Sequence, residues 1–123
     1  MGYIWGQIEF FQLVADSDFV LPLLDQSAEH LRPYFESKLA SSIPFAIGLG
    51  VPLVLHRDLA ASYGVETCGV GYEDGGLTGA MRIAIESSEA DRVRWQAALE
   101  TTRADLLATS LANLRDVIAG VAI

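Results

Sequence analysis

Positive charge and cysteine are both scarce in this chain. Its 123 residues carry 8 Lys and Arg side chains against 16 Asp and Glu, a net charge of -8, and Lys38 is the only lysine. Proteins bind nucleic acids and anionic membranes through several cationic side chains that displace counterions from phosphates. The composition therefore disfavours a nucleic-acid partner and a polybasic membrane anchor, but allows a small anionic ligand at a local site.

The shortage of cysteine and histidine excludes further classes of site. Cys68 is the sole cysteine, so the chain forms no internal disulfide and no zinc site with several thiolates. His30 and His56 are the only histidines, and no second ligand stands one helical turn after His56, so no metal site is expected. The start, MGYIWGQIEFFQ, lacks the basic segment and apolar core of a signal peptide. Together with a lone cysteine this predicts a cytoplasmic protein.

Charge is also absent from residues 39–55, LASSIPFAIGLGVPLVL. The run lies at the lower limit for a membrane span, which needs about 20 apolar residues. Ser41 and Ser42 are helix N-cap residues, Pro44 suits a first helical turn, and Gly50 suits a helix end. We therefore predict a short helix followed by a buried strand, and no membrane span.

The remaining sequence continues the alternation of strands and helices. We predict a short strand at residues 3–5 before an amphipathic helix, and further strands at 18–24, 51–55 and 65–72. Helices are expected after Asp58, from Leu77, and from Ser88 to Ala119 with a break near Thr109 and Ser110. The predicted fold is a single α/β domain over residues 1–123, with a three-layer, mostly parallel, Rossmann-like sheet of about four strands and C-terminal helices.

This order of segments resembles the C-terminal, nucleotide-sugar-binding half of GT-B-fold glycosyltransferases. The match is carried by FFQLVADSDFVLPLL, by KLASSIPFAIGLGVPLVL with its G-x-P turn at Gly50, Val51 and Pro52, and by YEDGGLTGAMRIAI. The resemblance implies that a nucleotide-sugar donor places its diphosphate at Ser41 and Ser42. It further implies that another chain or a missing N-terminal half supplies the acceptor site of a hexosyltransferase. Phe45 and Ser37 stand where many retaining members have two Glu residues, so that subfamily's donor contacts are absent.

Candidate substrate-binding residues lie at two places. Ser41 and Ser42 begin a helix whose N–H groups attract an anion, and Lys38 adds a positive charge nearby; alternatively, the serines only cap the helix. His56 and Glu73 follow two predicted strands, where parallel sheets gather their ligands, although Asp58 could simply cap a helix and residues 72–76 could be a plain turn.

No cofactor is expected, and no residue presents itself as catalytic. The glycines at 69, 71, 75 and 76 do not have the spacing of a dinucleotide fingerprint. The alternative function is a non-catalytic interaction module that self-associates as a homo-oligomer, because a sheet that lacks its first units leaves an exposed edge.

Overall fold

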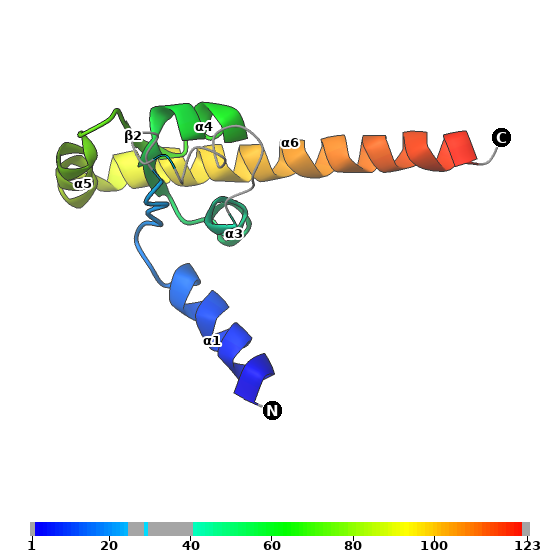
Figure 1. Cartoon of the computed structure of the whole chain (residues 1–123), viewed down its shortest axis with the longest axis horizontal. Coiled ribbons are helices and arrows are strands. Elements are labelled where there is room, and N and C mark those ends of the chain that lie inside the picture. Colours follow the sequence, from blue (N-terminus) through cyan, green and yellow to red (C-terminus); the bar gives the residue numbers. More distant parts are fainter. Residues whose placement is uncertain (1, 25–28, 30–40, 122–123) are drawn as a thin grey trace.

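The computed structural model of the protein describes residues 2–24, 29 and 41–121, with the backbone alone at residues 2–5 and 121. Helices dominate this part of the chain, and the strands lie among helices toward the end of the molecule that is opposite the C-terminus (Figure 1). In chain order the elements are α1 (Gly2–Ala15), α3 (Ser42–Leu49), β1 (Leu53–His56), α4 (Arg57–Tyr63), β2 (Gly69–Tyr72), α5 (Leu77–Ile85) and α6 (Glu89–Val121).

The sheet consists of β1 and β2, which are parallel and pair Leu53 with Gly69 and His56 with Tyr72. Val20 adds one parallel bridge on the other side of β1: its N–H donates to the Pro52 carbonyl and its carbonyl accepts from the Val54 N–H. All four residues of β1 are buried, because β1 lies between Val20 and β2 and both of its faces are covered.

The predicted three-layer, Rossmann-like sheet of about four strands is therefore wrong, and the part of the chain that the structure describes is mostly helical. Residues 3–5 belong to α1, which runs through Gly6 without interruption. The expected strand at 18–24 reduces to the bridge at Val20, since Pro22 has no N–H to donate. The expected strand at 65–72 contracts to Gly69–Tyr72.

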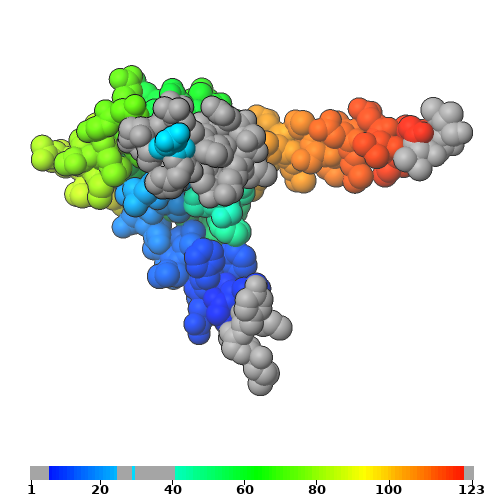
Figure 2. All heavy atoms as spheres, viewed as in Figure 1, coloured from blue at the N-terminus to red at the C-terminus, as the bar shows by residue number. Residues whose placement is uncertain are grey.

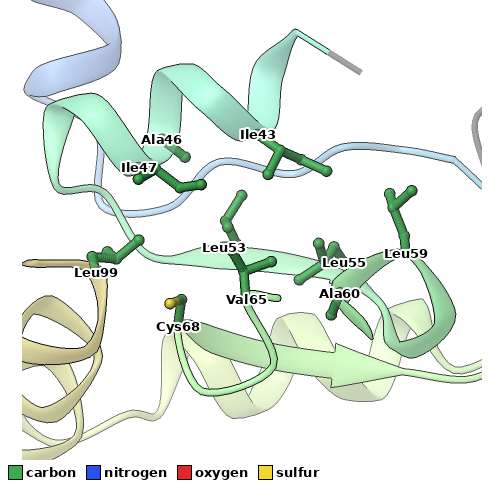
Figure 3. Packing of buried hydrophobic residues seen from close by; sticks show 10 residues of the cluster. All are labelled: Ile43, Ala46, Ile47, Leu53, Leu55, Leu59, Ala60, Val65, Cys68 and Leu99. Atoms are coloured by element: carbon green, nitrogen blue, oxygen red, sulfur yellow. The ribbon is translucent and has the colours of Figure 1, made fainter. Parts of the chain in front are cut away.

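One face of the sheet packs under α3 and α4. Leu53 and Leu55 point to this face, where they meet Ile43 and Ile47 of α3 and Leu59 of α4 (Figure 3). Burying a side chain of this size stabilises the fold by about 1.5–3 kcal/mol. Gly50 and Gly64 end α3 and α4 in the left-handed conformation, at φ 71° and φ 68°, as their positions in the sequence predict.

The other face packs under α5. Val54, Val70 and Tyr72 point to this face and contact Ala80 and Ala84. Helix α6 contributes to both faces, because Trp95 joins this cluster and Leu99 joins the cluster under α3. The Oγ1 of Thr102 in α6 lies 3.6 Å from the Sγ of Cys68, one residue before β2, so α6 passes the amino ends of the strands.

We call the sheet together with α3, α4, α5 and the first part of α6 the body of the molecule. Beyond the contact between Thr102 and Cys68, α6 leaves this body. Its 33 residues span about 50 Å, and Figures 1 and 2 show the C-terminal part standing clear of the other elements. Among the described residues, the last side-chain hydrogen bond from α6 to another element is that of Arg103, whose Nη1 donates to the Gly48 carbonyl at 3.0 Å. The predicted break at Thr109 and Ser110 is wrong: these residues weaken a helix only slightly, and no Gly or Pro interrupts residues 89–119.

Helix α1 forms a second arm and touches the rest through aromatic rings. Phe10 and Phe11 make edge-to-face contacts with Phe45 of α3, with ring centroids 5.8 Å and 5.5 Å apart. Among the helices that the structure describes, none is both long and apolar enough to cross a membrane.

Candidate functional site

His56 lies where β1 passes into α4, and its ring stabilises the start of that helix. Its backbone is extended, with φ −59° and ψ 138°, as an N-cap residue requires. The ring Nδ1 accepts a hydrogen bond from the Asp58 N–H at 3.1 Å. The expected cap at Asp58 is therefore wrong: His56 is the cap, and Asp58 lies in the first turn of α4, where its charge suits the helix dipole.

The other ring nitrogen of His56 connects the two strand ends. Its Nε2 lies 2.7 Å from Oδ1 of Asp74, which follows β2. Because Nδ1 accepts from a backbone N–H, the proton of the neutral ring resides on Nε2, and Nε2 donates to Asp74. The ring also meets Tyr72 edge-to-face, with centroids 5.7 Å apart.

This arrangement favours a structural role for His56. The ring is 4% exposed, and both nitrogens bond to groups of the chain itself. A general base must present an unshared nitrogen to its substrate. His56 would have to release the cap of α4 or the bond to Asp74 before it could accept a proton, so it joins the β1–α4 junction to the loop after β2.

Glu73 lies at the same edge and faces a cation. Its Oε1 is 3.6 Å from Nη1 of Arg57, and both side chains are largely exposed, so the pair adds little stability. Beside them is a shallow pocket of about 320 Å³. Its lining includes Arg57, Gly71, Tyr72, Glu73, Gly76 and Ala80. The structure thus brings His56 and Glu73 to one edge, as predicted.

A second pocket, of about 330 Å³, lies over the glycine face of β2. Gly69 and Gly71 stand opposite Leu53 and Leu55 in the sheet but have no side chain, so this face of β2 is hollow. Arg57 and Glu66 border the hollow with one charge of each sign. Neither pocket gathers several cationic groups around a polar cavity, as a diphosphate would need.

The other predicted donor-binding residues lie on a separate element. Ser41 is exposed and its side chain makes no capping hydrogen bond, while Ser42 is half-buried as the first residue of α3. Lys38 lies outside the described residues. In residues 2–24, 29 and 41–121 there is no group of three or more His, Cys, Asp or Glu side chains that could hold a metal ion.

A row of exposed apolar side chains lies on α6 instead. Four apolar residues of its projecting part follow one another at intervals of four, three and four residues; we call Leu107, Leu111, Leu114 and Ile118 the α6 stripe. Their exposed fractions are 60%, 45%, 54% and 58%. The sequence showed this helical spacing, but helical spacing alone does not tell whether the apolar face is covered within the chain.

Comparison of the chain with known protein families, with curated proteins and with solved structures finds no match.

Proposed function

We propose that the chain is a protein-interaction module whose working surface is the α6 stripe, which pairs with the apolar face of another helix. The observation that carries this proposal is the position of four large apolar side chains, each about half exposed, on a helix segment that leaves the body. The proposal follows the self-associating alternative from the sequence, but on a different surface from the sheet edge.

Two physical arguments support the assignment. Water does not favour large contiguous apolar surfaces, and on globular proteins such patches mark contact sites. Every residue of α6 from 103 to 120 is exposed, and a helix segment of that length is marginally stable in water by itself, because packing supplies most helix stability. A partner helix would cover the apolar surface and would stabilise the projecting segment. Intervals of three and four residues between apolar side chains are also those by which paired helices pack together.

Donor binding at Ser41, Ser42 and Lys38 remains a prediction, and so does the glycosyltransferase activity. The sheet on which the resemblance depended is not formed by the described residues. We favour the interaction module because it depends on contacts and exposures of the folded chain. A lone buried thiol suits a reducing compartment, so we propose that the module works in the cytoplasm.

The test uses a fluorescent helical probe peptide of 21 residues with Leu at every first and fourth position of its heptads. We expect the full chain to bind this probe in an anisotropy titration. The double variant Leu111→Glu/Leu114→Glu should weaken binding at least tenfold, because two carboxylates would be buried against Leu.

The matched control is Thr109→Glu/Asn113→Glu, which adds the same charge to exposed positions on the other face of α6. This control should bind the probe within a factor of two of the natural chain. Equal binding by both double variants, or no binding by the natural chain, would overturn the proposal. Circular dichroism should show both variants folded, since all four positions are exposed.

A further inference from the structure

We infer that the partner of the α6 stripe is a second copy of this chain, paired antiparallel to the first; this inference rests on the proposed function above. Two features of α6 support this inference. The α6 stripe is a self-complementary row of apolar side chains on a projecting helix, and Glu100 lies one heptad before it.

The spacing of the α6 stripe is the same in both directions along the helix. A two-fold axis between residues 112 and 113 would set Leu107 against Ile118 of the second copy and Leu111 against Leu114 of the second copy. Each contact then occurs twice, which gives four apolar layers with no unmatched member. A two-fold interface needs this property, because the same patch must complement itself.

The body of the molecule does not obstruct such a pair. Trp95 and Leu99 mark the face of α6 that packs into the body. At 3.6 residues per turn the α6 stripe lies roughly 110° around the helix from that face. A second helix would therefore meet α6 to the side of the face that packs into the body, and antiparallel pairing would put the two bodies at opposite ends.

Charge distinguishes the antiparallel from the parallel arrangement. Glu100 is exposed and precedes Leu107 by seven residues, so it lies on the same face of α6. A parallel pair in register would place the two Glu100 carboxylates in one layer, where like charges repel each other. Antiparallel pairing separates the same carboxylates by about 38 Å along the axis, at 1.5 Å per residue.

The flanking positions of the antiparallel pair are also compatible. Arg115 would lie beside Ala108 of the second copy, so its aliphatic stem could cover a small residue while its charge stays in water. Ser110 would lie beside Val117 of the second copy, which is 62% exposed in the single chain. No pair of like charges meets across this contact.

The size of the contact predicts a weak dimer. Each copy contributes one helix segment of about 18 residues, or about 27 Å. Such a contact is smaller than a standard interface of about 800 Å² per partner. We therefore expect a weak dimer that becomes populated only between about 10 µM and 1 mM protein.

The experiment combines sedimentation velocity with spin labelling of the full chain. We expect the mean mass to rise from one chain toward two between about 10 µM and 1 mM, and Leu111→Glu/Leu114→Glu to abolish the rise. A spin label on Thr101→Cys, an exposed position, should report a separation of about 34 Å, because 23 residues lie between the two labels along the antiparallel axis. The natural chain is the labelling control, since Cys68 is fully buried and should take up no label.

Two results would overturn the inference. A separation below about 20 Å would mean parallel pairing, because the labels would then lie side by side. A strict monomer at 1 mM would exclude the second copy as partner. If that monomer still binds the probe helix, the proposed function stands and the partner is another chain; if it does not, both proposals fail.

Discussion

Asp74 accepts a hydrogen bond from His56, with Nε2 and Oδ1 2.7 Å apart, and so links the loop after β2 to the end of β1. The same imidazole caps α4 through Nδ1. The His56 ring therefore connects the end of β1, the start of α4 and the loop after β2. Replacing His56 should test whether these contacts stabilise the fold.

Replacing His56 with Ala should lower the free energy of unfolding by about 1.5–3 kcal/mol, because it removes an N-cap and a part-buried hydrogen bond. His56→Asn should be about 1 kcal/mol milder, since Asn is itself a good N-cap residue and keeps the bond to the Asp58 N–H. Urea unfolding of the two variants measures both changes. If His56→Ala lowered the free energy of unfolding by less than about 0.5 kcal/mol, the contacts of His56 would not stabilise the fold.

Gly69 and Gly71 both lie in β2, and replacing each with Ala would test how closely the two strands approach each other. A Cβ at Gly69 would overlap the backbone carbonyl of Leu53, whereas a Cβ at Gly71 would lie 2.9 Å from Cγ of the exposed Arg57 side chain. Backbone atoms of a buried strand cannot move aside as a surface side chain can. We expect Gly69→Ala to destabilise the fold by about 3 kcal/mol or more and Gly71→Ala by less than about 1 kcal/mol.

Thermal and urea unfolding of the two alanine variants would decide this prediction. If Gly69→Ala were as stable as Gly71→Ala, the strands would not meet at the register that pairs Leu53 with Gly69.

Asp91 makes the start of α6 sensitive to acid. A hydrogen bond from the Ser88 N–H to its carboxylate, with smaller help from the Ser88 hydroxyl and Arg94, lowers the pKa of Asp91 below its ordinary value of 3.8. A lowered pKa means that the folded state favours the charged form. The stabilisation is therefore complete above the ordinary value and is lost as the pH falls through the lowered pKa.

We expect Asp91→Asn to be less stable than the natural chain at pH 7, and the difference to disappear at low pH, where Asp91 is protonated. Urea midpoints measured from pH 7 to pH 2 check this expectation. A difference that stays constant with pH would mean that the carboxylate charge contributes nothing to this end of α6.

The local elements could be predicted from the sequence because their signals are local. Gly50 and Gly64 mark the ends of α3 and α4, and Ser88 with Asp91 forms the reciprocal cap that starts α6. These signals depend on backbone conformation and hydrogen bonds within one turn, which neighbouring residues determine. The short helix predicted before Gly50 and the helices predicted near Asp58, from Leu77 and from Ser88 are accordingly confirmed.

The sheet and the working surface could not be predicted in the same way. An apolar run such as residues 3–5 or 18–24 suits a strand or a buried helix equally, and tertiary pairing decides between them. The residues of the α6 stripe likewise keep the helical period whether or not a partner covers them. Their exposure follows only from where α6 leaves the body after Arg103.

Replacing Glu100 with Leu should change the orientation of the proposed dimer. The substitution removes the like charges that oppose a parallel pair in register and adds a fifth apolar layer to it, while the antiparallel pair keeps its four layers around residues 112 and 113. We expect the spin-label separation at position 101 to fall from about 34 Å to below about 20 Å. Dimerisation should also strengthen, because the parallel contact is longer.

Glu100→Gln is the matched control, since it removes the charge and leaves a polar side chain in the layer. It should leave the dimer antiparallel and no tighter than that of the natural chain, because a buried polar amide adds no apolar contact. A label separation that stays near 34 Å in Glu100→Leu would show that Glu100 does not set the orientation. The direction of pairing would then depend on the two bodies rather than on the charge at this position.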